Sequence, residues 1–130
     1  MQFKKVYLVD DNPTTLFLHQ DVVSDVLPFS EIISYEDSEF FIKDFLQIPE
    51  TLKEPVLLLL DINMPIKTGY DLLEELEEEI DDLDNLNVIM VTSSNLRRDI
   101  ERSSRFTCII GYLEKPITVN NLKTALLGGY

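Results

Sequence analysis

The sequence lacks several features that would assign it to a specialised class of protein. It contains a single cysteine, Cys108, so no internal disulfide can form, and its apolar surroundings indicate a buried thiol in a reduced compartment. No segment approaches the ~20 consecutive apolar residues that a membrane-spanning helix needs. The short apolar stretch near the N-terminus runs directly into acidic residues, unlike a signal peptide. We therefore expect a cytoplasmic location and no membrane association.

Basic residues are also scarce. The chain has 11 Lys and Arg against 24 Asp and Glu, which gives a formal net charge of −13. Because nucleic acids and anionic membranes bind proteins with a surplus of Lys and Arg, this charge argues against direct binding to DNA or to an anionic membrane. Much of the acidic excess lies in "EELEEEIDDLD" (74–84), where apolar residues recur every three or four positions. This pattern predicts an amphipathic helix whose acids face solvent.

Ordinary features of a globular domain are present instead. The 130 residues are 45% hydrophobic and 27% charged, which predicts one domain over residues 1–130. Short apolar runs alternate with segments of helical periodicity, and this alternation is typical of parallel βαβ units in a doubly wound α/β fold. The predicted strands are 6–9, 32–35, 56–60, 88–91 and 108–113, and the predicted helices are 13–27, 38–48, 70–83, 95–104 and 118–127.

Polar side chains follow the predicted strands of this five-stranded parallel sheet. Asp10 and Asp11 follow the first strand, Asp61 the third, Thr92 the fourth and Lys115 the fifth. In open α/β sheets, ligands bind in the crevice beyond the carboxyl ends of the strands. We therefore expect these five side chains to form one polar cluster.

The composition of this cluster is suited to phosphoryl transfer. Carboxylates packed closely together repel one another, and a hard cation such as Mg²⁺ relieves the repulsion. The ammonium group of Lys115 can bind a carboxylate or a phosphate. A carboxylate beside Mg²⁺ can itself attack phosphorus and become an aspartyl phosphate. These residue types predict Mg²⁺-dependent phosphoryl transfer onto an aspartate.

Four motifs carry a resemblance to a known family over essentially the whole chain. They are "VDD" at 9–11, "DINMPIKTG" at 61–69, "VTSS" at 91–94 and "YLEKP" at 112–116. In this order and spacing they resemble a receiver domain of a two-component response regulator, of the CheY-like type. The resemblance implies a flavodoxin-like (βα)5 fold with strand order 2-1-3-4-5, and a role in phosphorelay signalling.

The resemblance also implies individual roles around the phosphoacceptor. Asp61 would accept the phosphoryl group. Asp11, Asp61 and the backbone carbonyl of Asn63 would bind Mg²⁺, with Asp10 assisting through water. Asn63 and Ser94 occupy positions that in this family tune the lifetime of the phosphorylated state.

Further roles concern the response to phosphorylation. Thr92 would donate a hydrogen bond to one phosphoryl oxygen, and Lys115 would pair with another. Tyr112 would change rotamer as Thr92 moves toward the phosphoryl group. The Lys115–Pro116 peptide bond would be cis.

Two other residues, His19 and Gly69, are expected to have structural rather than chemical roles. His19 lies within the first helical pattern, away from the strand ends, and we expect it on the surface. Gly69 is expected to give the backbone conformational freedom before the following helix.

Three alternatives remain open at this point. A degenerate receiver could bind partners without being phosphorylated. A haloacid-dehalogenase-type enzyme would need a general acid/base two residues after its aspartate, where this chain has Asn63. A flavodoxin-like electron carrier would have to place the FMN phosphate beside Asp10 and Asp11, which would repel it.

The expected partners are proteins. The resemblance implies phosphate transfer from a sensor histidine kinase or a phosphotransfer protein, and no turnover of a small-molecule substrate. A downstream protein would bind the face formed by the fourth helix, fifth strand and fifth helix. The same face could support a homodimer, since its arginines could meet the acidic helix of a second copy; they are Arg97, Arg98, Arg102 and Arg105. The last predicted helix extends almost to the end of the chain, so no effector domain is expected within it.

Overall fold

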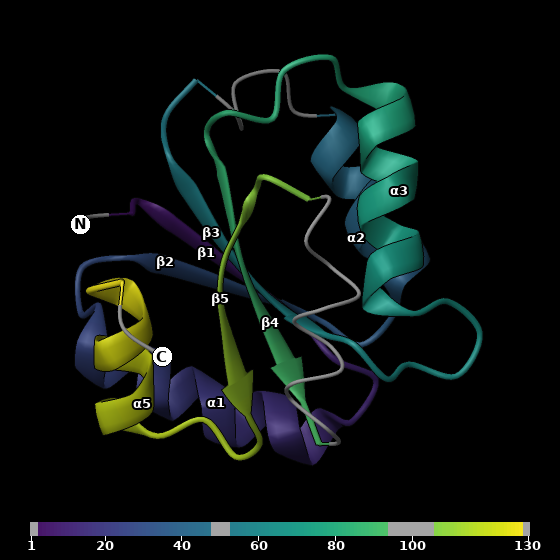
Figure 1. The fold of residues 1–130 in the computed structure, drawn as a ribbon. Coiled ribbons are helices and arrows are strands. Elements are labelled where there is room, and N and C mark those ends of the chain that lie inside the picture. Colours follow the sequence, from purple (N-terminus) through teal and green to yellow (C-terminus); the bar gives the residue numbers. More distant parts are fainter. Residues whose placement is uncertain (1–2, 48–52, 94–105, 129–130) are drawn as a thin grey trace.

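Five parallel strands form the centre of the protein (Figure 1). The computed structural model describes residues 3–47, 53–93 and 106–128. The strands are β1 (Lys5–Val9), β2 (Glu31–Tyr35), β3 (Val56–Asp61), β4 (Leu86–Thr92) and β5 (Ile109–Glu114). Their order in the sheet is β2-β1-β3-β4-β5, so the predicted doubly wound, flavodoxin-like topology is confirmed.

Helices cover both faces of the sheet. The described helices are α1 (Pro13–Val26), α2 (Ser38–Gln47), α3 (Gly69–Glu79) and α5 (Val119–Leu126). Helices α1 and α5 lie on one side of the sheet, and α2 and α3 lie on the other (Figure 1). The predicted helix at 95–104 falls outside the described residues. No helix in the described ranges has the length and apolar character needed to cross a membrane.

The central strand β3 shows why the sheet needs cover on both faces. All six of its residues are buried, and successive side chains point to opposite sides. Leu58 and Leu60 pack in the cluster beneath α2 and α3, whereas Leu57 and Leu59 pack in the cluster beneath α1 and α5. An unbroken apolar run is therefore the sequence expected for this strand.

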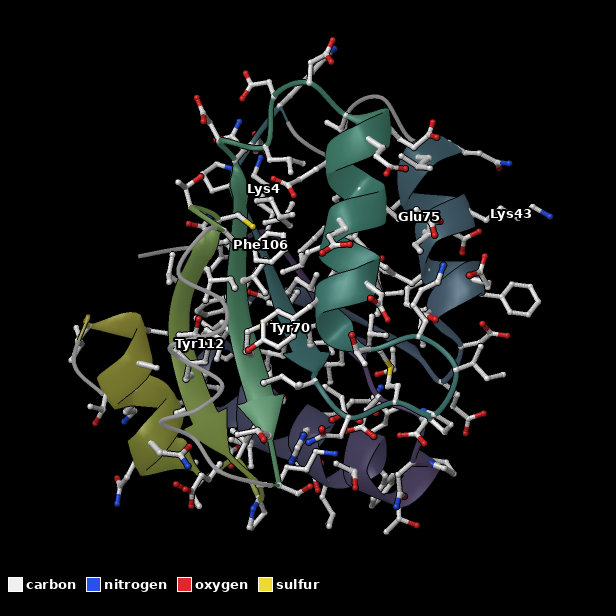
Figure 2. All side chains as sticks on the ribbon, turned by 45° about the vertical axis from the view of Figure 1, so that its right-hand side comes forward. Lys4, Lys43, Tyr70, Glu75, Phe106 and Tyr112 are labelled. Atoms are coloured by element: carbon white, nitrogen blue, oxygen red, sulfur yellow. The ribbon has the colours of Figure 1, made fainter. Side chains whose placement is uncertain are left out.

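The space beside α3 is filled partly by aromatic side chains. Tyr70 of α3 and Phe106, which precedes β5, stack with ring centroids 6.1 Å apart and an interplanar angle of 19°. Figure 2 shows both rings in front of β4. Nearby Cys108 is buried as predicted, and burial raises the pKa of its thiol to about 11.

Side-chain caps fix where three helices begin. The Asn12 side chain accepts hydrogen bonds from the Thr14 and Thr15 N–H groups, at 2.9 and 3.2 Å. Thr68 and Thr118 form reciprocal capping boxes at the starts of α3 and α5. Since each of these helices follows the carboxyl end of a parallel strand, all three N-termini lie at the same edge of the sheet as the polar residues that follow the strands.

The acidic helix α3 is shorter than the periodicity predicts. It ends at Glu79 rather than at residue 83, because Ile80 adopts an extended conformation (φ −124°, ψ 120°). The Asp82 carboxylate accepts a hydrogen bond from the Asp84 N–H (2.9 Å), an Asx turn that competes with helix formation. The predicted helix boundary was therefore wrong, although the acids within α3 do lie toward solvent.

Gly69 is required for a different reason from the one expected. Within the described residues, the positive-φ glycine is Gly128, so conformational freedom does not explain Gly69. Instead, a Cβ atom at position 69 would lie 2.8 Å from the Asp61 carbonyl oxygen and 3.1 Å from Met90 Cε. The Gly69 N–H also donates to the Ile62 carbonyl at 3.0 Å. Glycine permits the loop after Asp61 to close tightly against the end of β3.

This packing predicts that Gly69→Ala destabilises the protein. The added methyl group must displace backbone at the end of β3, so we expect the free energy of unfolding to fall by about 1–3 kcal/mol. Urea denaturation followed by circular dichroism measures the change. Ser24→Ala, at an exposed position of α1, is the control and should change stability by no more than about 0.5 kcal/mol. Equal stability of the two variants would contradict the close-packing explanation.

Candidate functional site

The carboxyl ends of four neighbouring strands bring the predicted site residues together. Asp10 directly follows β1, Asp61 ends β3, Thr92 ends β4 and Lys115 directly follows β5. Since β1, β3, β4 and β5 are adjacent in the sheet, these residues share one edge. The polar cluster predicted from the sequence is therefore present.

Lys115 lies between two buried carboxylates. Its Nζ atom is 2.8 Å from Asp10 Oδ2 and 3.3 Å from Asp61 Oδ1. Burial alone would lower the pKa of Lys115, but hydrogen bonds and charges of the two carboxylates outweigh it and raise that pKa. The ammonium group is therefore held in its charged form.

Of the two carboxylates beside Lys115, that of Asp61 has its negative charge less well compensated by hydrogen bonds and nearby positive charge. Only 1% of the residue is exposed, and its Oδ1 accepts hydrogen bonds from Lys115 and from the Asn63 N–H (3.1 Å). Within the described structure its Oδ2 atom is buried without a hydrogen-bond partner. Burial raises the pKa of Asp61 to about 6, and the negative charge of Asp10 adds to this effect, while Lys115 and the Asn63 N–H oppose it. A buried oxygen left in this state is costly and is suited to receive a ligand.

Three carboxylates at this edge could hold a metal ion. Asp10, Asp11 and Asp61 each offer one oxygen, and these oxygens lie within 4.8 Å of one another. Asp10 and Asp61 are buried, whereas Asp11 is exposed. An all-oxygen set of this kind, together with the unpartnered Asp61 Oδ2, fits a hard cation such as Mg²⁺ that keeps part of its water shell.

The predicted hydroxyl lies on the other side of Asp61. Thr92 is fully buried at the end of β4, and the Asn63 side-chain amide approaches its Oγ1 at 3.5 Å. Tyr112 lies on β5 (Figure 2), paired with Met90 of β4, and is 5% exposed. Its ring is therefore packed inside the protein. Ser94, predicted to tune the site, lies outside the described residues.

The segment after β5 is anchored to β4 through its backbone. The Lys115 N–H donates to the Thr92 carbonyl at 2.8 Å, and the Lys115–Pro116 peptide bond is cis. This hydrogen bond extends the β4–β5 pairing to the residue that carries the ammonium group. The predicted surface arginines at 97, 98, 102 and 105 all lie outside the described residues.

His19 is not on the surface, and the sequence interpretation of it was wrong. The residue is 5% exposed, and its Nε2 accepts a hydrogen bond from the Ile117 N–H at 3.2 Å. Burial lowers the pKa of His19, an effect that Lys115 reinforces and Asp10 opposes. The sequence did contain the signal, because residue 19 shares its helix stripe with buried Leu16 and Val23.

Lys67 is a second residue that the sequence interpretation missed. It belongs to the loop between β3 and α3, and its ammonium group forms ion pairs with Glu39 of α2 and Glu75 of α3. Glu75 is labelled in Figure 2. The loop that carries the site residues after Asp61 is therefore tied to both helices on that face of the sheet.

Comparison with known families gives a consistent assignment. A sequence model described as "Response regulator receiver domain" matches residues 6–127. A curated relative, the probable transcriptional regulator ycf29 of Porphyra purpurea, is 39% identical over 66 residues. That match covers 51% of this chain and only 31% of the relative, so the chain spans about a third of the relative's length.

Solved structures share the fold. A two-component response regulator from Cytophaga hutchinsonii superposes with a TM-score of 0.85 at 23% identity, covering 98% of this chain and 96% of that one. The chemotaxis protein CheY4 of Vibrio cholerae gives a TM-score of 0.76 at 18% identity, covering 96% of this chain and 97% of that one. At these identities the superpositions support the fold alone.

The raised pKa of Asp61 predicts a pH-dependent stability difference between the wild type and Asp61→Asn. Because folded Asp61 holds its proton more tightly than it does in the unfolded chain, its contribution to wild-type stability declines as pH rises from about 4 to about 6. A pKa raised from 3.8 to about 6 corresponds to about 3 kcal/mol, so Asp61→Asn should be more stable at pH 7.5 by up to that amount. Urea unfolding with a metal chelator, at several pH values, measures the difference.

The advantage of the variant should shrink as the pH falls toward 4. Asp25→Asn, which alters an exposed acid of α1, is the matched control and should show no comparable pH-dependent gain. A variant Asp61→Asn that is less stable than the wild type at pH 7.5 would contradict the account of an under-compensated carboxylate.

Proposed function

Because the chain belongs to the response regulator receiver domain family of two-component signalling proteins, we propose that Asp61 accepts a phosphoryl group from a phosphohistidine. Receiver domains are signalling proteins rather than classical enzymes, and on this proposal the chain promotes only its own phosphorylation and dephosphorylation. We also propose a single receiver domain over residues 1–130, and the family match over residues 6–127 supports this. Membership in this family argues against the haloacid-dehalogenase-type enzyme and the flavodoxin-like electron carrier.

One observation carries the proposal. Asp61 is a buried carboxylate with one oxygen unpartnered in the described structure, and its other oxygen is 3.3 Å from the Lys115 ammonium group. Two further carboxylates, Asp10 and Asp11, lie within reach of a shared cation. An acceptor, a fixed positive charge and a cation-binding group are the components that phosphoryl transfer to a carboxylate requires.

The proposed transfer follows from these positions. A carboxylate oxygen of Asp61 attacks phosphorus while the bond to the donor imidazole nitrogen breaks, and the imidazole leaves with that electron pair and takes up a proton. A pKa of about 6 leaves Asp61 mostly ionised at neutral pH, as a nucleophile must be. Lys115 is mostly buried and charged beside the acceptor, so it can pair with a phosphoryl oxygen with little reorganisation.

The cation has a defined role in this proposal. Asp11, Asp61 and the Asn63 carbonyl would hold Mg²⁺ directly, with Asp10 assisting through water. Bound there, it supplies the positive charge that offsets repulsion between the carboxylate and the phosphoryl oxygens.

The proposed output is a change in conformation. A phosphoryl group on Asp61 offers new acceptors to Thr92 and Lys115, which favours the state in which both contacts form. Thr92 is fully buried and Tyr112 is packed on the adjacent strand, so a shift of Thr92 would alter the space available to that ring. Asn63 and Ser94 are proposed to tune the lifetime of the phosphate, and the approach of the Asn63 side-chain amide to Thr92 Oγ1 at 3.5 Å supports this role for Asn63.

The proposed partners are a sensor histidine kinase or phosphotransfer protein upstream and a protein downstream. The downstream partner, or a second copy of the chain, would bind the surface that includes β5 and α5. We also propose a cytoplasmic location, since the free, buried thiol of Cys108 is typical of a protein from a reducing compartment.

Phosphorylation by a small-molecule donor tests the proposal. After incubation with acetyl phosphate and Mg²⁺, intact-protein mass spectrometry should show the gain of one phosphoryl group, and a chelator should abolish it. Asp61→Asn should show no gain, whereas the control Asp25→Asn should behave as the wild type. Equal modification of wild type and Asp61→Asn would overturn the assignment of the acceptor.

A second measurement covers the case in which the phosphoryl group on Asp61 is lost before mass analysis. Beryllofluoride with Mg²⁺ should bind at Asp61 in place of the phosphoryl group and shift the NMR resonances of labelled Tyr112. If the wild type shows neither a mass gain nor this shift, the proposed function is wrong and a phosphorylation-independent binding module becomes the better interpretation.

A further inference from the structure

A buried histidine outside the proposed reaction lies beside the site. His19 is on α1, 5% exposed, and its Nε2 accepts a hydrogen bond from the Ile117 N–H at 3.2 Å. Ile117 is only two residues beyond Lys115. The histidine therefore connects α1 to the segment that carries the positive charge of the site.

The Ile117 N–H needs this acceptor. Ile117 is 3% exposed and lies between Pro116, which has no N–H, and Thr118, the N-cap of α5. The Thr118 N–H is already bonded to the Asn121 side chain at 2.8 Å. A buried backbone N–H without an acceptor is costly, so the imidazole meets a requirement that the local secondary structure leaves open.

Two backbone anchors hold the 115–117 segment. On one side of Pro116, the Lys115 N–H donates to the Thr92 carbonyl of β4 at 2.8 Å. On the other side, the Ile117 N–H donates to His19 of α1. Between these anchors the Lys115 side chain extends to Asp10 and Asp61. Loss of the hydrogen bond to His19 would release the Ile117 end of the segment and would leave the acidic residues themselves unchanged.

The imidazole also lies close to the acids themselves. A cavity of about 10 Å³, the space of roughly one water molecule, is bordered by His19, Asp10 and Asp61 together with apolar side chains. Burial lowers the pKa of His19, which keeps Nε2 free of a proton and able to accept at neutral pH.

We infer that His19 is a positioning residue: by accepting the Ile117 N–H, it holds the 115–117 segment against α1 and fixes the Lys115 ammonium group where it meets a phosphoryl oxygen. This inference rests on the proposed function. His19 touches neither donor nor acceptor in this account, and it acts through Lys115. Misplacement of a charged group by about 1 Å can cost up to ~100-fold in rate, so the effect of losing the anchor should be measurable.

Three variants separate positioning from general packing. His19→Leu keeps a side chain of similar size and removes the acceptor. His19→Gln places an amide oxygen near the position of Nε2, whereas the shorter His19→Asn cannot reach Ile117 N–H. Since Gln and Asn are both polar amides, their comparison remains informative even if His19→Leu does not fold.

The measurements are beryllofluoride affinity, which depends on Lys115, and Mg²⁺ affinity in the absence of beryllofluoride, which depends on the acids. For His19→Leu and His19→Asn we expect beryllofluoride affinity and the rate of phosphorylation by acetyl phosphate to fall roughly tenfold or more. His19→Gln should stay within about threefold of the wild type, because it restores the acceptor. Mg²⁺ affinity should not fall in any folded variant, because the three acids are unchanged and a displaced Lys115 competes less with the ion for Asp10 and Asp61. Urea unfolding of each variant establishes that it is folded under the assay conditions.

Two results would overturn the inference while leaving the proposed function intact. One is a wild-type level of beryllofluoride binding and phosphorylation in His19→Asn. The other is an equal loss of Mg²⁺ and beryllofluoride affinity, which would indicate a general disturbance of packing. If the wild-type protein neither becomes phosphorylated nor binds beryllofluoride, the proposed function fails first and this inference falls with it.

Discussion

The pairing of one ammonium group with two buried carboxylates is the constraint on which the site depends. Lys115 Nζ lies 2.8 Å from Asp10 Oδ2 and 3.3 Å from Asp61 Oδ1, and the side chains of both acids are at most 5% exposed. One positive charge cannot fully compensate two negative ones. The imbalance remains at Asp61, which has the raised pKa and the unpartnered oxygen. The unliganded site therefore favours whatever supplies further positive charge or removes negative charge from that carboxylate.

The fold holds these two carboxylates and the ammonium group close together despite the charge imbalance. Each of the three charged groups comes from the end of a different strand, so the distances between them are set by the sheet. The segments that follow β3 and β5 are each anchored more than once. The loop after β3 is held by the close approach at Gly69 and by the ion pairs of Lys67, and the segment after β5 is held by β4 and α1. Because closely packed structure does not deform continuously, a new contact at Asp61 would act on these supports instead of being absorbed locally.

Much of the fold and the site's composition could be predicted from the sequence, because both depend on local patterns. The run that ends in Asp61 predicts a strand buried on both faces, and the rule for open sheets then places Asp10, Thr92 and Lys115 beside it. The errors have different causes. The close approach that requires glycine at position 69 is a tertiary contact, which becomes visible only when the chain is folded. The end of α3 depends on local competition, because an Asx turn at Asp82 follows just beyond the helix. His19 was misjudged because its polar chemistry was given more weight than its place in the apolar stripe of α1.

The most direct test of the central claim is chemical location of the phosphoryl group. Borohydride reduces an aspartyl phosphate to homoserine, whereas a free carboxylate does not react. Protein treated with acetyl phosphate and Mg²⁺, then reduced, digested and sequenced by tandem mass spectrometry, should carry homoserine at position 61. Homoserine at position 10 or 11 instead, or unreduced aspartate at all three positions in protein that has gained a phosphoryl group, would contradict the account.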